Sequence, residues 1–511
     1  MILILDFGSQ YTHLIARRIR ELGSYAEILP FNISVTKIIK LKPQGIILSG
    51  SPSSVYDKNA PFPKKRVFNL NIPILGICYG QQVIAKILGG KTKAKKLREF
   101  GRETITILDK SSLFKGCKNK ETVWFSHGDT VTELPKRFKK IGSSKSSKIA
   151  AFENYDSRVF GIQFHPEVTH TVNGLKILKN FTYNICKEKE SWKISDTKRR
   201  LISELKKQIG EEPVLIGVSG GIDSFVVATL IKNTIGNRLY CVFVDNGLLR
   251  KNEPEEVKNL FQKRGFRNFL MIDAKKQFLT ALRGIVDPEK KREIIGHTFI
   301  RVFEKKAKEL EKKQVKIKFL AQGTIYPDRI ESAQPSKDAT KIKSHHNITL
   351  PKKLKFQIIE PIKELYKDEV RELGRELGLP KPIIGRHPFP GPGLAIRILG
   401  EITDERLSIL RETDDIFLSE LRKNKLYDKI WQAFAVLLPL KTVGVMGDLR
   451  TYEYIISLRA VTSKDGMTAD WAKIPPKVLE KISSRIINEV MEVNRVVYDI
   501  SQKPPATIEY E

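Results

Sequence analysis

Cysteine is scarce in this sequence of 511 residues. The four cysteines are scattered along the chain and form no C-x-x-C pair: Cys78, Cys117, Cys186 and Cys241. This spacing argues against a disulfide framework and against a zinc site, and it is typical of proteins from a reducing compartment. We therefore expect a cytoplasmic protein that binds no zinc.

Long apolar runs, internal repeats and low-complexity tracts are also missing. No stretch is long and apolar enough to span a bilayer. The opening segment MILILDFGSQ has neither a basic leader nor a cleavage site, so we expect a first strand there and not a signal peptide. With 41% hydrophobic and 29% charged residues, the chain is expected to fold into two to four soluble domains.

Positive charge is what the sequence has in excess, with a formal net charge of +32. Such a charge fits a nucleic-acid-binding protein, or a lysine-rich surface with sites for polyanionic small molecules. The basic residues are spread over much of the chain, and they show no interleaved aromatic pattern for stacking on bases. The second interpretation is favoured, so we expect no specific nucleic-acid partner and no membrane partner.

One cysteine lies where a structural thiol has little reason to be. Cys78 stands between Gly76 and Gly80, where the apolar run Ile72–Leu75 meets a helix-like segment. The G-x-C-x-G spacing is typical of a nucleophile elbow, a sharp strand-to-helix turn that exposes a reactive side chain. The helix after the turn would direct its N-terminus at the sulfur and favour the thiolate. Cys78 is therefore a candidate nucleophile.

A base and a carboxylate follow another apolar run. Val159–Phe164 is strand-like and ends at His165, Pro166 and Glu167. Short apolar runs alternate with helical patterns in this part of the chain, which predicts a parallel α/β sheet with functional loops at its strand ends. We predict that His165 takes the proton of Cys78 and that Glu167 orients the imidazole. Apart from His127, the other histidines lack this context.

Four segments, GICYGQQ, SGSPSSV, WFSHGD and GIQFHPE, resemble those of the class I glutamine amidotransferases, from about Met1 to about Lys189. The resemblance implies that Cys78 attacks the side-chain amide of glutamine, forms a thioester and releases ammonia. It also implies residues for the oxyanion hole and the glutamine pocket: Gly50, Tyr79, Gln82, Ser126 and His127. For Gln82, the alternative is an ordinary residue of the first helical turn.

The pattern restarts after the charged segment KEKESWKISDTKRR. Val214–Val218 is strand-like, Ser219 to Gly221 form a glycine loop, and a helix begins at about Asp223. Such a loop and helix N-terminus favour a bound pyrophosphate. The Walker lysine is absent, which argues against P-loop phosphoryl transfer. The S-G-G-x-D-S pattern resembles the PP-loop of ATP pyrophosphatases, which cleave ATP between its α- and β-phosphates.

This second resemblance implies an ATP site with Mg²⁺ as its cofactor and no organic prosthetic group. Asp223 would be the metal ligand, because a carboxylate oxygen suits Mg²⁺. The implied ATP-binding residues are Ser219, Gly220, Gly221, Ile222, Asp223, Ser224, Val244 and Gly323. The segment KSHHNITLP would be a lid over the phosphates.

The composition changes at GRHPFPGPGLAIRILGEI, residues 385–402. Its prolines and glycines alone fit a linker, but Arg386, His387 and Arg397 suit an anion-binding rim. Over essentially the whole chain, SGGIDS, GTIYPD, HPFPGPGLAIR, GVMGDLRTYEY, DGMTADW and KPPATIEYE resemble the glutamine-hydrolysing GMP synthases in order. The resemblance implies that ATP adenylates xanthosine monophosphate (XMP) at O2 and that ammonia then displaces AMP to give GMP. The implied XMP-binding residues are Arg292, His387, Lys503, Thr507 and Glu509.

Three domains follow from these resemblances, all of the α/β or α+β class. We expect a glutamine amidotransferase domain at 1–190 and a PP-loop, adenine-nucleotide α-hydrolase-like domain with a parallel sheet and flanking helices at 195–385. A smaller α+β domain at 386–511 would bind XMP and form a homodimer. The chain departs from the family pattern in a lid shorter by one residue and at Arg329, Leu449, Gln502 and Tyr510, none of which is assigned to chemistry.

Two other functions stay open on the residues alone. A PP-loop transferase acting on RNA would share S-G-G-x-D-S and a basic surface, but such thiolases usually need a working cysteine in that domain. Cys241 lies inside an apolar strand and is a poor candidate. A nucleic-acid-binding protein with vestigial catalytic motifs is disfavoured because Cys78, His165, Glu167 and Asp223 are intact.

Overall fold

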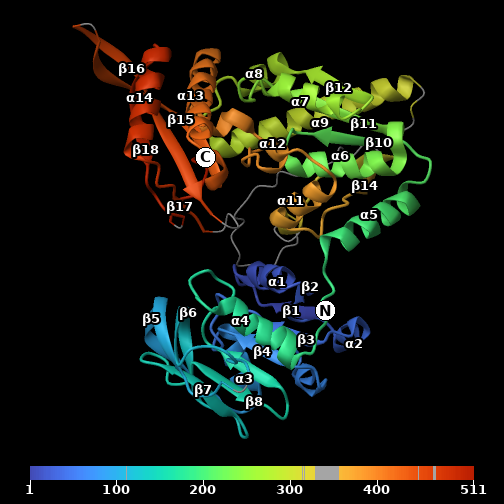
Figure 1. Ribbon diagram of the computed structural model, residues 1–511, viewed down its shortest axis with the longest axis vertical. Coiled ribbons are helices and arrows are strands. Elements are labelled where there is room, and N and C mark those ends of the chain that lie inside the picture. The colour runs from blue at the N-terminus through green and yellow to red at the C-terminus, as the bar shows by residue number, and fades with distance from the viewer. Residues whose placement is uncertain are drawn as a thin grey trace. The chain divides into compact units, whose positions relative to one another are not determined.

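The computed structural model describes residues 1–110, 112–313, 315, 317–328, 356–446, 448–463, 468–503 and 505–511. These residues form two compact units, Met1–Thr197 and the described residues from Lys198 onwards (Figure 1). The predicted boundary at residue 385 lies within the second unit and stays a prediction. The predicted lid KSHHNITLP and Arg329 lie outside the described residues. Within the described part of the chain, no helix could cross a membrane.

The first unit is built on a nine-stranded sheet with the order β2-β1-β3-β4-β9-β8-β7-β5-β6. Its strands are β1 (Ile2–Asp6), β2 (Ala26–Pro30), β3 (Gly45–Leu48), β4 (Ile74–Ile77), β5 (Lys91–Ile107), β6 (Lys120–Glu133), β7 (Lys139–Ser144), β8 (Ala151–Asn154) and β9 (Val159–Ile162). Its helices are α1 (Thr12–Glu21), α2 (Val35–Leu41), η1 (Lys65–Asn69), α3 (Tyr79–Ile87), α4 (Gly174–Lys179) and η2 (Asn180–Ile185). Strands β2, β1, β3, β4 and β9 are parallel, as the sequence predicts.

The parallel strands of this sheet are short apolar runs. Every residue of β3, β4 and β9 is buried, which is typical of parallel strands covered by helices on both faces. The carboxyl ends of these three strands lie at the same edge of the sheet. Ser49 and Gly50 follow β3, Cys78 follows β4, and residues 163–167 follow β9. The sheet therefore brings these loops together.

The second unit contains a five-stranded parallel sheet with the order β12-β11-β10-β13-β14. Its strands are β10 (Val214–Val218), β11 (Leu239–Asp245), β12 (Asn268–Asp273), β13 (Phe319–Ala321) and β14 (Gln357–Ile359). The helices of this part are α5 (Ile194–Ile209), α6 (Ile222–Ile235), η3 (Gly236–Arg238), α7 (Glu253–Lys263), α8 (Lys275–Leu282), α9 (Pro288–Lys312), α11 (Lys367–Glu376) and α12 (Lys381–Ile384). The central strand β10 and its neighbour β11 both contact α6.

The carboxyl-terminal part of the second unit is α+β. Two long antiparallel strands, β15 (Gln432–Met446) and β16 (Leu449–Thr462), form a hairpin. The remaining elements are η4 (Gly393–Arg397), α13 (Asp404–Lys423), η5 (Tyr427–Lys429), β17 (Asp470–Trp471), α14 (Pro476–Glu489) and β18 (Val493–Asp499). Strand β18 pairs in parallel with β16, α13 packs on β15, and α14 packs on β18 and α13.

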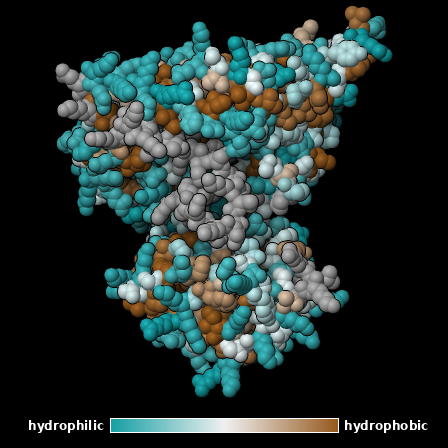
Figure 2. Space-filling model, turned by 180° about the vertical axis from the view of Figure 1, so that it is seen from behind, coloured by the Kyte–Doolittle hydropathy of each residue, from teal (hydrophilic) through white to brown (hydrophobic). Residues whose placement is uncertain are grey.

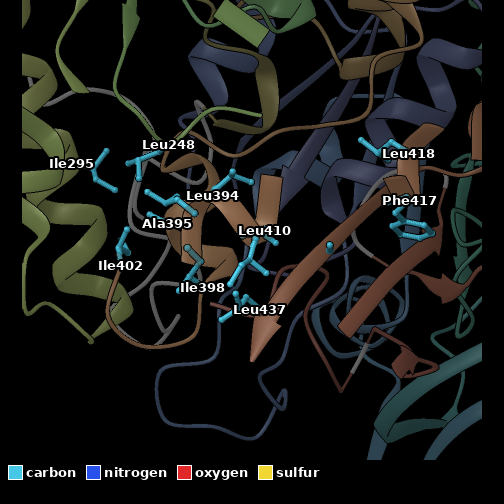
Figure 3. Close-up of a cluster of buried hydrophobic side chains, with 14 of the residues drawn as sticks. Leu248, Ile295, Leu394, Ala395, Ile398, Ile402, Leu410, Phe417, Leu418 and Leu437 are labelled. Carbon is cyan, nitrogen blue, oxygen red and sulfur yellow. The ribbon is translucent and has the colours of Figure 1, made fainter. Parts of the chain in front are cut away.

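The proline-rich segment joins the two parts of the second unit through their core. Leu394, Ala395 and Ile398 are fully buried and belong to one apolar cluster that includes residues of both sheets. In Figure 3 these side chains lie between Ile295 of α9 and the side chain of Leu410 in α13. The segment is thus a core element of the second unit and not a free linker.

Candidate active sites

Cys78 lies on a sharp turn between β4 and α3. Its backbone has φ 54° and ψ −105°, a left-handed conformation that is costly for a residue with a Cβ. A Cβ on Gly80 would lie 2.4 Å from the carbonyl oxygen of Leu48, and one on Gly76 would lie 2.5 Å from the carbonyl carbon of Gly80. Both glycines therefore let α3 begin directly against the sheet. This is the strand-to-helix turn that the G-x-C-x-G spacing predicts.

His165 and Glu167 form a buried pair beside this turn. The Nδ1 atom of His165 lies 2.7 Å from Oε1 of Glu167, and His165 interacts electrostatically with Cys78. Burial lowers the pKa of His165, but the carboxylate of Glu167 and the charge on Cys78 outweigh burial and raise that pKa above its ordinary value. The structure thus places a cysteine, a histidine and a carboxylate in the order that a nucleophile, its base and an orienting group would need.

Backbone contacts fix the loop that contains this pair. The backbone N–H of His165 donates to the carbonyl of Trp124 at 3.0 Å, and its carbonyl accepts from the hydroxyl of Thr171 at 2.5 Å. Arg18, a buried residue of α1, donates from Nε to the carbonyl of Glu167 at 3.0 Å. These bonds hold the imidazole and the carboxylate in one arrangement relative to β9.

The residues predicted for the oxyanion hole and the glutamine pocket lie around Cys78. A Cβ on Gly50 would lie 3.3 Å from Cε1 of His165, so the backbone of Gly50 borders the reacting groups. The carbonyl of Ser126 lies 3.5 Å from the sulfur of Cys78. Tyr79, the residue after Cys78, is buried and begins α3.

Gln82 and His127 converge on one backbone carbonyl. Nε2 of Gln82 donates to the carbonyl of Asp129 at 2.7 Å, and Nδ1 of His127 lies 3.0 Å from the same oxygen. The carboxylate of Asp129 accepts from the hydroxyl of Ser54 at 2.5 Å and from the N–H of Val55 at 3.3 Å. Sequence analysis overlooked Asp129, although it is the last residue of the WFSHGD segment. It links that segment to the loop after β3.

The glycine loop after β10 wraps around the N-terminus of α6. The hydroxyl of Ser224 accepts from the N–H of Ser219 at 3.3 Å and donates to the carbonyl of Gly221 at 3.1 Å. Gly220 has φ +73°, a conformation that favours glycine. A Cβ on Gly323 would lie 3.1 Å from the backbone nitrogen of Ser224, so the loop after β13 approaches the same helix end. The structure thus brings most of the predicted ATP-binding residues together.

Asp223 pairs with a lysine that sequence analysis did not single out. Nζ of Lys367, at the start of α11, lies 2.5 Å from Oδ2 of Asp223. Oδ1 of Asp223 is buried and has no hydrogen-bond partner among the described residues. Arg386 donates to the carbonyl of Gly220 at 2.9 Å and to Glu253 at 2.6 Å. The loop is therefore lined by two basic side chains from distant parts of the chain.

Two further predicted residues flank the loop. Ile222 is the buried first residue of α6. Val244 lies near the carboxyl end of β11, next to β10 in the sheet, and its side chain is buried. Its backbone is thus at the same edge of the sheet as the glycine loop.

Of the residues predicted to bind XMP, Glu509 has the most defined surroundings. The guanidinium of Arg397 donates two bonds to the Glu509 carboxylate, at 2.9 and 3.1 Å, and Nε2 of Gln432 donates a third at 2.5 Å. Arg397 is fully buried between the rings of Phe389 and Phe434. The carboxylate of Glu509 therefore balances the charge of the buried Arg397. Arg397 is not part of the predicted anion-binding rim.

The other predicted XMP residues lie in the same unit. Arg292 donates to the carbonyl of Glu511 at 2.6 Å and pairs with Glu289. Lys503 exchanges two backbone hydrogen bonds with Ala469, at 2.8 and 3.0 Å. The hydroxyl of Thr507 donates to the carbonyl of Glu509. These hydrogen bonds from Arg292, Lys503 and Thr507 hold the carboxyl-terminal segment in place.

His387 is a buried, neutral histidine. Its Nδ1 accepts from the N–H of Ala433 at 3.2 Å, and its Nε2 lies 2.9 Å from the carbonyl of Tyr427, whose ring stacks on the imidazole at 3.7 Å. Burial is the main cause that lowers the pKa of His387 to about 4. Because both ring nitrogens are engaged with the backbone, any role of His387 in XMP binding would be to order the loop.

Comparison with known proteins defines the class first. A family model described as "Glutamine amidotransferase class-I" matches residues 3–185, which contain the Cys78 site and the nine-stranded sheet. The first unit is therefore a class I glutamine amidotransferase domain. A second model, described as "GMP synthase C terminal domain", matches residues 419–510.

Full-length relatives then define the family. A relative from Carboxydothermus hydrogenoformans named "GMP synthase (glutamine-hydrolyzing)" is 55% identical over 511 residues, with 100% of this chain and 99% of the relative covered. Relatives of the same name and coverage from Thermosipho melanesiensis and Brachyspira hyodysenteriae are 55% and 53% identical. The chain belongs to the glutamine-hydrolysing GMP synthases.

Proposed function

We propose that this enzyme makes GMP by using ammonia from glutamine at the first unit and ATP-activated XMP at the second. The observation that supports the proposal most strongly is the cysteine–histidine–glutamate arrangement of the first unit in a chain that also contains the S-G-G-x-D-S loop. A glutaminase without an acceptor would have no use for an ATP-binding loop. We also propose the domain boundaries 1–190, 195–385 and 386–511.

The first half-reaction follows from the geometry around Cys78. The thiolate attacks the side-chain carbonyl of glutamine, and the N–H groups of Gly50 and Tyr79 stabilise the oxyanion. Loss of one such donor typically costs about 10²–10³ in rate. His165 gives its proton to the leaving ammonia and then takes one from the water that hydrolyses the thioester to glutamate. Glu167 orients the imidazole and stabilises the imidazolium whenever His165 is protonated.

The surroundings of the glycine loop suit a magnesium-bound nucleotide. Asp223 offers a buried carboxylate oxygen without a partner among the described residues, which fits a hard cation. Magnesium, when bound with ATP, neutralises charge on the phosphates. The backbone N–H groups of the loop and the N-terminus of α6 would bind the pyrophosphate. We propose the same role for the hydroxyls of Ser219 and Ser224, and contact of the Val244 backbone and Gly323 with the nucleoside.

The second half-reaction joins the two substrates of this unit. O2 of XMP attacks the α-phosphorus of ATP, and pyrophosphate leaves. Ammonia then adds at C2 of the purine, and AMP leaves to give GMP. We propose that the XMP site includes Arg292, His387, Lys503, Thr507 and Glu509.

An exposed apolar surface supports a homodimer through the carboxyl-terminal part. Val443 and Tyr452 are neighbours across the β15–β16 hairpin, and they are 47% and 55% exposed. Val445 lies on the same face as this pair and is 72% exposed, whereas Leu449, 73% exposed, lies on the other face near the end of the hairpin. Figure 2 shows apolar residues at the end of this hairpin. Clustered apolar side chains of this kind mark protein interfaces. We propose a cytoplasmic homodimer without a specific nucleic-acid or membrane partner.

Two variants test the two-site function in one assay. GMP formation is measured with Mg-ATP and XMP, and with either glutamine or ammonium as nitrogen source. Cys78→Ala is expected to lose activity with glutamine and keep it with ammonium, whereas Asp223→Asn is expected to lose at least about 100-fold with both. If the wild-type protein makes no GMP from either source, the acceptor is wrong. If Cys78→Ala keeps glutamine-dependent activity, Cys78 is not the nucleophile.

A further inference from the structure

A buried glutamine contacts the sulfur of Cys78. Gln163 follows β9 and is fully buried, and its Nε2 lies 3.9 Å from the sulfur. The backbone fixes both residues, because the N–H of Gln163 donates to the carbonyl of Ala150 at 2.9 Å and the N–H of Cys78 donates to the carbonyl of Ile162 at 2.8 Å. The end of β9 therefore holds the amide of Gln163 next to the sulfur of Cys78.

The sulfur of Cys78 has neighbours that favour opposite protonation states. The carbonyl of Ser126, 3.5 Å away, can only accept and therefore favours the neutral thiol. His165 interacts electrostatically with Cys78, and the amide of Gln163 is a hydrogen-bond donor to the sulfur that cannot lose its proton. A hydrogen bond to a charged acceptor is stronger than one to a neutral acceptor, so the Gln163 amide favours the thiolate.

The cost of burying this amide supports a role at the sulfur. Oε1 of Gln163 is buried and has no hydrogen-bond partner among the described residues. A buried polar atom without a partner destabilises the fold and calls for an explanation. Among those residues, the sulfur of Cys78 is the one side-chain partner that the structure records for Gln163.

We infer that Gln163 is a positioning residue for the glutaminase reaction, whose Nε2–H donates to the sulfur of Cys78 and favours the thiolate. In this state Gln163 donates to the sulfur, and His165 interacts with Cys78 electrostatically. The inference rests on the proposed glutaminase function of the first unit, but its first test does not require glutamine.

That test measures the alkylation of Cys78 by iodoacetamide in the full-length protein as a function of pH. The thiolate displaces iodide, so the rate follows the fraction of sulfur that is ionised, and mass spectrometry of the Cys78 peptide gives that rate. Gln163→Met removes the donor at similar side-chain volume. We expect alkylation at neutral pH to slow about tenfold and the midpoint of the profile to move up by about one pH unit.

Gln81 provides a matched control. It is also fully buried, its Nε2 donates to the carbonyl of Ile149 at 3.3 Å, and its Oε1 likewise has no partner among the described residues. Gln81→Met therefore removes a comparable amide that does not contact the sulfur, and its alkylation profile should coincide with that of the wild type. Gln163→Glu keeps the shape but adds a negative charge, so it should slow alkylation more than Gln163→Met.

Kinetics separate this role from a general loss of structure. Gln163→Met should reduce glutamine-dependent GMP formation at neutral pH about tenfold, recover part of it at higher pH, and leave ammonium-dependent formation unchanged. An unshifted alkylation profile in both Gln163 variants would overturn the inference, as would equal slowing by Gln81→Met. Should Gln163→Met fail to fold, Gln163→Glu decides by the same criterion. A wild type inactive with glutamine would refute the proposed function, while the alkylation profiles would still decide on Gln163.

Discussion

Replacing Gly80 by alanine should misplace the reacting groups of the first unit. The new Cβ would lie 2.4 Å from the carbonyl oxygen and 2.8 Å from Cβ of Leu48, both parts of the buried strand β3. Ordinary contacts of this kind need about 3.4 Å or more, so α3 must withdraw by about 1 Å. Cys78 and the N–H of Tyr79 would move with it. A displacement of about 1 Å can cost roughly 100-fold in rate, and overpacking of this kind costs about 1–3 kcal/mol of stability.

The assay compares glutamine-dependent with ammonium-dependent GMP formation, together with unfolding in urea. Gly80→Ala should reduce the first rate about 100-fold and leave the second within a factor of about two. Gly296→Ala is the control, because a Cβ there meets no atom within 4 Å and the position is inside α9. That variant should keep both rates and gain about 0.8–1 kcal/mol in helix stability. A folded Gly80→Ala protein that keeps glutamine-dependent activity within about threefold of wild type would refute the packing argument.

Two predictions concern the second unit. Because the pKa of His387 is lowered to about 4, the native state stays neutral where the unfolded state is protonated, so the free energy of unfolding should fall by up to about 3 kcal/mol as the pH drops from 6.5 towards 4. Urea unfolding at pH 7.5 and 5.0 measures this loss. If the His387→Gln variant lost the same free energy of unfolding, His387 would not be its cause. Val443→Asp places a charge on the exposed hairpin surface and should convert a homodimer to a monomer in analytical ultracentrifugation. An unchanged mass, or a monomeric wild type, would contradict the proposed interface.

The features that the sequence predicts are those encoded in short segments. Glycines on both sides of Cys78 indicate the turn because only a small residue fits against the neighbouring strand. The apolar run Val214–Val218 followed by S-G-G predicts the strand and the loop that the structure shows. The parallel order of the strands follows from the alternation of apolar runs with helical patterns, and it brings His165 to the cysteine. Local chemistry and one topological rule are sufficient for these.

The features that sequence analysis missed depend on packing between distant segments. Lys367 lies 144 residues from Asp223, and no local pattern indicates that α11 begins beside the glycine loop. Gln163 lies within a recognised motif, but glutamine is chemically unremarkable until its distance to the sulfur is known. The proline-rich segment resembled a linker or an anion-binding rim because its composition does not show that Leu394 and Arg397 are buried.

The burial of the proline-rich segment limits how this enzyme can be divided or recombined. A chain cut before residue 386 would lose Leu394, Ala395 and Ile398 from the apolar cluster and leave Leu248 and Ile295 facing water. The part of the second unit before residue 386, taken alone, would therefore aggregate unless it kept this segment. For the same reason, exchange of the carboxyl-terminal segment between related enzymes would alter the packing around β10 and β11. Gene fusions and laboratory chimeras of this chain should join it at residues outside 385–402.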